Sequence, residues 1–164
     1  MNKPVKIAFF GSDEIALPCL QAMSNSLDIV EISAVLTQPD RRSGRGRTLQ
    51  SNAIKQWAIE SSVPIRDPQK PGIEEVTWLK ELGVDLILVM AYGHILKQAL
   101  LDAAPLGCFN LHASLLPKYR GASPIETSIA MGEEITGVTL MQVIPQMDAG
   151  PIIDSESIYI TSED

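Results

Sequence analysis

The run Asp85-Leu86-Ile87-Leu88-Val89-Met90-Ala91 is apolar on both faces of a β-strand. Continuous apolar character, rather than alternation, is typical of a strand in a parallel sheet that helices cover on both sides. Gly83 stands just before the run, in the position of a glycine that ends a helix over residues 73–82. Val5–Phe10 and Ile29–Thr37 are two more strands of mainly apolar residues. The centre of the chain therefore predicts an α/β protein.

Strands and helices alternate through the rest of the sequence. Further strands are expected at 63–65, 108–112, 137–144 and 152–160, the last near a sheet edge because its apolar residues partly alternate. Helices are expected at 96–103 and 124–131, and another helix is expected to begin with Ser51 as its N-cap. Residues 38–50 are polar and basic and are expected to form a loop. Such alternation predicts an open, mostly parallel, Rossmann-like sheet with helices on both faces.

The composition limits the classes of protein. The chain has 164 residues and a net charge of −7, which suits one globular domain and argues against binding nucleic acid over the whole surface. Its longest apolar run is too short to span a bilayer, so no membrane association is expected. Cys19 and Cys108 lie in apolar runs without a CxxC pair, which favours buried free thiols in the reducing cytoplasm. The chain ends on Thr161-Ser162-Glu163-Asp164, the composition of a helix start, and is expected to be a fragment.

Ligands of an open parallel sheet bind beyond the carboxyl ends of its strands. The residues to inspect are therefore 11–13, 38–50, 92–94, 110–124 and 145–150. After the first strand only Gly11 is present, followed by Ser12-Asp13-Glu14, so the GxGxxG pattern of a dinucleotide site is missing. A nicotinamide-dependent dehydrogenase is disfavoured.

Three polar residues are expected at this edge of the sheet, and together they suggest a type of chemistry. Asn110 and His112 are two apart at the end of a strand, so their side chains share one face. Asp148 lies in a later loop at the same predicted edge. A histidine beside a carboxylate holds its proton more firmly, and the asparagine amide is an uncharged donor to an oxyanion. With no activated nucleophile nearby, the set suits direct acyl transfer to an external amine.

The segment from Asn110 to Pro124, with Thr136–Leu140 and Met147–Gly150, resembles the formyltransferases that use N10-formyltetrahydrofolate. The resemblance covers essentially the whole chain. It implies that Asn110, His112 and Asp148 are catalytic and that 10-formyltetrahydrofolate is the co-substrate, with no metal. It also implies that the residues contacting the folate are Tyr92, Ser114, Leu115, Leu116 and Pro117.

A basic segment indicates the acceptor. Four of the seven residues from 41 to 47 are arginines, namely Arg41, Arg42, Arg45 and Arg47. The segment is similar to the insertion with which methionyl-tRNA formyltransferases contact the acceptor arm of initiator methionyl-tRNA. The resemblance then implies a cytoplasmic monomer acting in translation initiation, with residues 1–164 as the catalytic domain and a C-terminal, OB-like tRNA-binding domain absent.

Two other classes of function stay open: a formyltransferase with another acceptor, and a module without catalysis. A formyltransferase acting on an amino-sugar nucleotide shares the folate half and the trio, but gives no reason for the arginines. A glycinamide ribonucleotide acceptor would favour a glycine-rich phosphate turn after the first strand, which Gly11-Ser12-Asp13 is not. A folate-binding module without catalysis is the reading from another class, and the intact trio speaks against it.

Overall fold

A computed structural model describes residues 3–43 and 48–164. The chain divides into two compact units, Met1–Cys108 and Phe109–Asp164, which are described separately below. Within the described residues, no helix is long and apolar enough to cross a membrane.

The first unit is built on a parallel sheet. Its strands, β1 (Val5–Phe10), β2 (Val30–Leu36), β5 (Ile65–Arg66) and β6 (Leu86–Val89), lie in the order β5-β2-β1-β6. Pairing is parallel throughout, with Phe10 opposite both Leu36 and Val89. The carboxyl half of β1 is fully buried, and so is Ile87 of β6, as the unbroken apolar character of both strands predicts.

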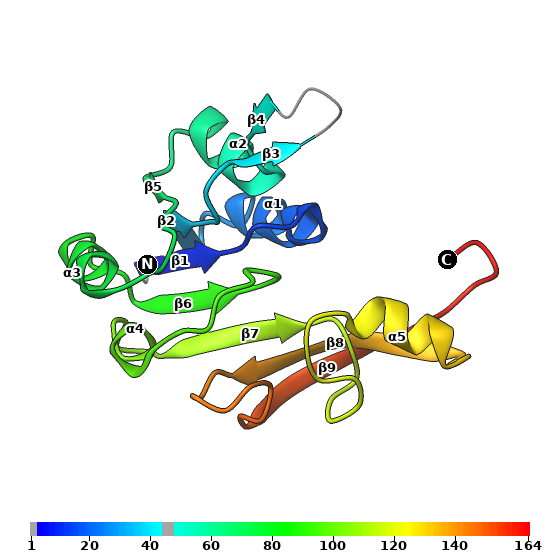
Figure 1. The fold of residues 1–164 in the computed structure, drawn as a ribbon. Coiled ribbons are helices and arrows are strands. Elements are labelled where there is room, and N and C mark those ends of the chain that lie inside the picture. The colour runs from blue at the N-terminus through cyan, green and yellow to red at the C-terminus, as the bar shows by residue number, and fades with distance from the viewer. Residues whose placement is uncertain (1–2, 44–47) are drawn as a thin grey trace. The chain divides into compact units, whose positions relative to one another are not determined.

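A helix follows each of these strands: α1 (Leu17–Ser24), α2 (Ala53–Glu60), α3 (Ile73–Glu81) and, after β6, the short α4 (Gln98–Leu101). The chain moves outward from β1 through β2 to β5, and then returns past β1 to β6. Because each crossover is right-handed, a helix that leads the chain toward one edge of the sheet lies on one face, and a helix that leads it toward the other edge lies on the opposite face. Accordingly α1 and α2 lie on the same side of β1 and β2 (Figure 1), whereas α3 packs against α4. Helices on both faces of the sheet are thus confirmed.

The helix ends follow the expected capping chemistry with one correction. Asp13 Oδ1 accepts the Ile15 amide at the start of a short 3₁₀ helix, η1 (Glu14–Ala16), that leads into α1. Gly83, at φ +66, ends α3 as predicted. The cap of α2 is Asn52, whose Oδ1 accepts the Lys55 amide, and not Ser51. Serine and asparagine cap equally well, so residue type alone does not choose between neighbours.

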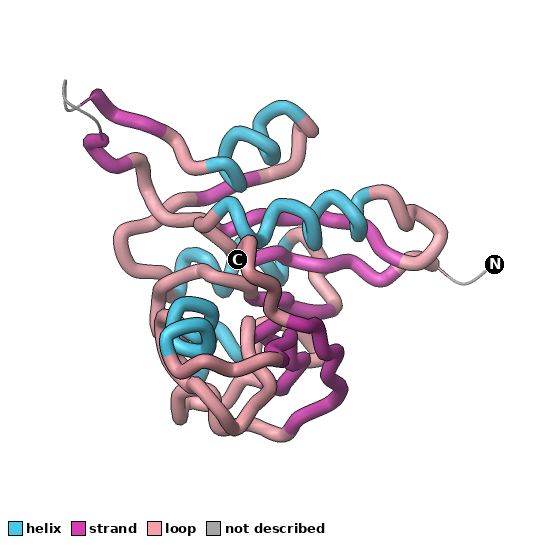
Figure 2. The backbone as a smooth tube through the Cα atoms, turned by 90° about the vertical axis from the view of Figure 1, so that its right-hand side faces the viewer, coloured by secondary structure: helices cyan, strands magenta, loops and turns pink. Residues whose placement is uncertain are grey.

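The segment expected to be a loop contains a β-hairpin. β3 (Arg41–Ser43) pairs antiparallel with β4 (Thr48–Gln50), with Arg41 opposite Gln50. In Figure 2 the two strands run side by side and extend beyond the other elements of their unit. The prediction of an unstructured loop is wrong at these six positions, because a polar two-stranded ribbon needs no apolar periodicity. Arg45 and Arg47 lie outside the described residues.

The second unit is an antiparallel sheet with one helix. β7 begins at Cys108 and ends at His112, α5 spans Pro124–Ala130, and β8 (Ile135–Gln142) pairs with both β7 and β9 (Ile152–Tyr159). β9 is exposed along its whole length, as expected of an edge strand. The α/β class and the open, mostly parallel, Rossmann-like sheet are confirmed, and the antiparallel pairings within that sheet are those of β7 with β8 and of β8 with β9.

Both cysteines are free thiols, with Cys108 buried and Cys19 half-buried. Burial raises the pKa of the Cys108 thiol to about 12 and also raises that of Cys19. The thiolate is the reactive form, so we expect a thiol reagent at pH 8 to modify Cys108 only after unfolding. Cys19 should react in the native protein, but more slowly than a free thiol. Mass spectrometry of the labelled protein checks this, and prompt labelling of native Cys108 would contradict it.

Candidate active site

The carboxyl ends of β1, β2 and β6 meet, as the predicted topology requires. Ser12 Oγ donates a hydrogen bond to the Tyr92 carbonyl oxygen at 3.1 Å and accepts one from the Gln38 amide at 3.0 Å. Gln38 Nε2 also donates to the Tyr92 carbonyl, at 2.9 Å. Three segments singled out from the sequence are therefore joined at one edge of the first unit.

The turn after β1 does not fit a phosphate group. The Gly11 amide donates to the Leu36 carbonyl and the Ser12 amide to the Ala91 carbonyl, so neither is free for an anion. The Asp13 carboxylate occupies the start of the following helical turn. A Cβ at position 11 would lie 2.7 Å from the Phe9 ring and 3.0 Å from the Met90 carbonyl, so close packing explains this glycine.

The Tyr92 side chain is buried in the first unit. Its ring packs 5.4 Å from that of Phe10 and 5.1 Å from that of His94, and its hydroxyl has no partner among the described residues. Burial is the main cause that raises the pKa of the Tyr92 phenol, so the hydroxyl stays protonated. Burial, and secondarily the charge of Arg41, lowers the pKa of His94.

The base of the β3–β4 hairpin is tied to the sheet edge. Lys55 Nζ lies 2.7 Å from Asp40 Oδ1 and 2.8 Å from Asp67 Oδ2, and the hydrogen bond from Lys55 lowers the pKa of Asp40. Asn52 Nδ2 donates to the Gln38 carbonyl, and Arg41 donates to the Gln38 side chain. The exposed Arg41 and Arg42 are thus carried by a ribbon whose root is held in place.

In the second unit, β7 presents Asn110 and His112 on one face. They pair with Met141 and Thr139 of β8, and both of these partners are buried. His112 is 6% exposed, whereas Asn110 is half-buried. Within the described part of the chain, no protein group is hydrogen-bonded to the side-chain amide of Asn110, which leaves that amide available for a bound molecule.

The structure brings Asp148 to His112. Their Oδ2 and Nδ1 atoms are 3.7 Å apart, both side chains being largely buried. The other ring nitrogen, Nε2, lies 2.9 Å from the carbonyl oxygen of Tyr119. A carbonyl oxygen can only accept, so Nε2 carries a proton and Nδ1 is the nitrogen left to take up or release one.

The Asp148 carboxylate is held in place by residues with positive φ, a backbone conformation that residues other than glycine adopt rarely. Asp148 has φ +46, and its Oδ2 accepts the Gly121 amide at 2.9 Å, with Gly121 at φ +105. A side chain at position 121 would find space but would strain this backbone. At position 150 a Cβ would overlap the Gln142 carbonyl oxygen, so Gly150 lets the Asp148 turn lie against β8.

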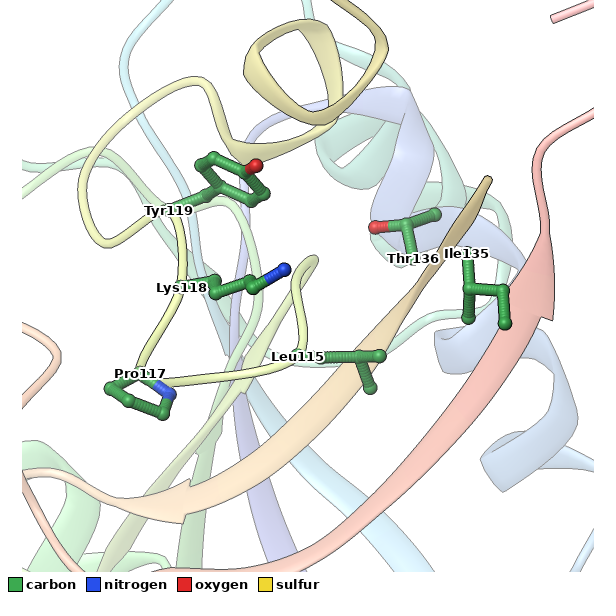
Figure 3. Close-up of a pocket in the computed structure, with 6 residues that line it drawn as sticks. All are labelled: Leu115, Pro117, Lys118, Tyr119, Ile135 and Thr136. Atoms are coloured by element: carbon green, nitrogen blue, oxygen red, sulfur yellow. The ribbon is translucent and has the colours of Figure 1, made fainter. Parts of the chain in front are cut away.

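The loop after β7 contains the four residues expected beside the folate. Ser114 is buried, and its Oγ donates to the Lys118 carbonyl. The Leu116 amide donates to Thr139 Oγ1, which itself donates to the Ser114 carbonyl. A pocket of about 250 Å³ opens beside this loop (Figure 3), lined by Leu115, Pro117, Lys118, Tyr119, Ile135 and Thr136.

Neither the serine hydroxyl nor the cysteine thiol near His112 in the sequence is suited to act as a nucleophile in covalent catalysis. The Ser114 hydroxyl is committed to a carbonyl oxygen, and the thiol of Cys108 is buried and protonated. Among the described residues, no group of three His, Cys, Asp or Glu side chains comes together in a way that could hold a metal ion.

Sequence reasoning missed Tyr119, Gly121 and Glu133. Tyr119 acts through its carbonyl, Gly121 through its amide, and Glu133 through its contacts with the same loop. Backbone groups leave no residue-type signal, and only the glycine after Arg120 indicated an unusual turn.

Comparisons with known proteins agree on a family. A family model described as formyl transferase matches residues 5–164. The methionyl-tRNA formyltransferase of Bifidobacterium adolescentis is 42% identical over 95% of this chain and 49% of that protein, and that of Legionella pneumophila strain Paris is 44% identical over 96% and 50%. The chain therefore spans about half the length of these curated relatives.

A solved structure supports the same assignment. The phosphoribosylglycinamide formyltransferase from Bacillus halodurans superposes with a TM-score of 0.79 at 26% identity, over 97% of this chain and 82% of that one. The sequence match over nearly the whole chain and the shared fold lead to one conclusion: the chain belongs to the formyl transferase family.

Proposed function

We propose that the protein transfers the formyl group of 10-formyltetrahydrofolate to the amino group of initiator methionyl-tRNA, in the cytoplasm, as a monomer. The observation that carries the proposal is the His112–Asp148 pair, in which Nε2 of the imidazole faces the Tyr119 carbonyl oxygen and Nδ1 faces the Asp148 carboxylate. The 41–45% identical relatives named methionyl-tRNA formyltransferase support the acceptor. Residues 1–164 are proposed as the catalytic domain.

The residues of the second unit divide the chemistry of direct transfer. The co-substrate supplies an activated formyl group at N10. Asn110 donates its amide hydrogen to the oxygen that becomes negatively charged when the amine attacks. The bond between the amino nitrogen and the formyl carbon forms and the C–N10 bond breaks; His112, as the imidazolium that Asp148 stabilises, gives its Nδ1 proton to the departing N10 and takes up the proton that the attacking amine loses. Tyr92 and residues 114–117 are proposed to contact the folate.

Two observations separate this acceptor from the alternatives. The turn after β1 has its amides engaged and a carboxylate at its end, which disfavours the phosphate of a ribonucleotide. The arginines of the hairpin, on a chain of net charge −7, favour a polyanion larger than a sugar nucleotide.

The test is an acceptor assay with labelled 10-formyltetrahydrofolate. Methionyl-tRNA, a 4-amino-sugar nucleotide and glycinamide ribonucleotide are offered separately to the same protein. We expect label on methionyl-tRNA and background levels on the other two. Label on the sugar nucleotide alone would establish that alternative, and folate binding without transfer to any amine would favour the non-catalytic module.

A substitution of Asp148 tests its proposed role. Asp148→Asn keeps an oxygen for the Gly121 amide but removes the negative charge beside His112 Nδ1. We expect turnover to fall by at least about 10-fold and the pH profile to change, while folate binding stays the same. Asp154→Asn, at an exposed carboxylate of the same unit, is the matched control. An Asp148→Asn enzyme with full rate and unchanged pH profile would remove this role.

A further inference from the structure

Tyr119, whose carbonyl oxygen contacts His112, has an unfavourable backbone conformation. Tyr119 has φ +55, a left-handed conformation that L residues other than glycine, asparagine and aspartate adopt rarely. The next residue but one is Gly121, which donates to Asp148. The tip of the loop thus contacts both members of the His112–Asp148 pair through its backbone, and something must hold it there.

One carboxylate ties down the side chains of this tip. Tyr119 donates its phenolic hydrogen to Glu133 Oε1 at 2.5 Å, and Lys118 Nζ lies 2.9 Å from the same oxygen. Figure 3 shows both side chains extending from the loop toward the start of β8, where Ile135 and Thr136 lie. The Glu133 amide in turn donates to the Ser128 carbonyl at the end of α5, which fixes the carboxylate's own backbone.

The contacts of the Glu133 carboxylate with Tyr119 and Lys118 form a tether, and this tether is complete at neutral pH. Hydrogen bonds from Lys118 and then from Tyr119 lower the pKa of Glu133, and the bond to Glu133 raises the pKa of Tyr119. The carboxylate is therefore ionised and the phenol protonated across the neutral range. Because the pKa of Glu133 is lowered in the folded state, the tether is lost only as the pH falls through that lowered value.

We propose that Glu133 is a positioning residue for the reaction: it holds Tyr119 so that the Tyr119 carbonyl keeps the proton of His112 on Nε2 and turns Nδ1 toward Asp148. The inference rests on the proposed function for its kinetic consequence, but its structural consequence is independent of any substrate. The first half of the loop has separate anchors at Ser114 and Leu116, so loss of the tether frees the tip without unfolding the loop.

The primary measurement is the tautomer of His112 in the 164-residue chain. The sequence has two histidines, so the resonances of His112 are assigned by their loss in His112→Gln. Long-range ¹H–¹⁵N spectra identify which ring nitrogen carries the proton in the neutral form. We expect the Nε2–H form in the wild type, a mixture of both forms in Tyr119→Phe and Glu133→Ala, and no change in Glu134→Ala, which removes an adjacent exposed carboxylate.

The kinetic measurement separates positioning from general stability. We expect Tyr119→Phe and Glu133→Ala to lower kcat by roughly 10-fold, less than the ~10²-fold that a misplacement of about 1 Å costs. The KM for 10-formyltetrahydrofolate should change far less than kcat. The double variant should be no slower than Glu133→Ala alone, because both substitutions break the same tether.

The outcomes decide two questions separately. A wild type without the Nε2–H form, or folded tether variants that match Glu134→Ala in tautomer and kcat, would overturn the positioning role. If Glu133→Ala fails to fold, Tyr119→Phe decides, since it removes one hydroxyl only. An inactive wild type whose tautomer still changes in the tether variants would overturn the proposed function and support the positioning role.

Discussion

Replacement of His112 by alanine is expected to lower turnover by ~10²–10⁴-fold, the range for loss of a positioned general acid or base. Nε2 of His112 faces the Tyr119 carbonyl oxygen and Nδ1 lies beside Asp148, and the alanine variant removes the imidazole that the proposal assigns to the proton transfer. The substitution should leave the affinity for the folate nearly unchanged, because the loss falls on the transition state. Single-turnover transfer to methionyl-tRNA and equilibrium binding of a folate analogue measure the two effects.

Exogenous imidazole provides the control for this variant. A cavity left by the missing ring should admit imidazole and restore part of the rate, whereas a general loss of structure would not be rescued. A His112→Ala enzyme with near-normal turnover would exclude His112 from the mechanism, and a variant that lost folate binding and rate equally would point to a binding role.

Neutralising Arg41 and Arg42 together should raise the KM for methionyl-tRNA and flatten its dependence on salt. Both side chains are exposed on β3, whose base is held by Asp40–Lys55 and by Gln38. Each phosphate contact that is lost should reduce the slope of log KM against log salt by about one unit. Binding of 10-formyltetrahydrofolate should hardly change.

A charge-matched variant tests the specificity of this effect. Lys70→Gln with Lys97→Gln removes two positive charges from exposed positions outside the hairpin. If that pair changes the salt slope as much as the arginine pair, the effect is one of net charge and the hairpin is not a specific contact. An unchanged slope in the arginine variant would exclude Arg41 and Arg42 from the tRNA interface. Arg45→Gln with Arg47→Gln is a second, independent pair.

The fold was largely predictable because its signals are local. The apolar run at 85–91 contains β6, Gly83 ends α3 with a positive φ, and the partial alternation after 152 marks an exposed edge strand. These patterns work because burial on two faces, helix termination and edge exposure each select residue types at fixed positions. The hairpin at 41–50 was missed because its strands are polar and bury nothing that periodicity could reveal.

Alternation along one strand placed Asn110 and His112 together correctly, since residues two apart in a strand share a face. The sequence also supplied Asp148 as the acidic partner, although 36 positions separate it from His112 and no local pattern joins them. That proximity comes from the antiparallel return of β8 and from the turn that Gly150 allows against it. The candidate site residues were therefore singled out by their chemistry, and the contact between His112 and Asp148 comes from tertiary pairing.

The residue types at 110, 112 and 148, the basic segment at 41–47 and the parallel α/β core are properties of the amino-acid order, and they already indicated acyl transfer to an amine. The orientation of His112 is a property of the folded molecule. It depends on the Tyr119 carbonyl and on the left-handed backbone conformation that directs this carbonyl toward the imidazole. It also depends on the carboxylate of Glu133, 14 residues after Tyr119, which holds the loop. A carbonyl oxygen is the same in every residue, so only the three-dimensional arrangement decides which one meets the imidazole.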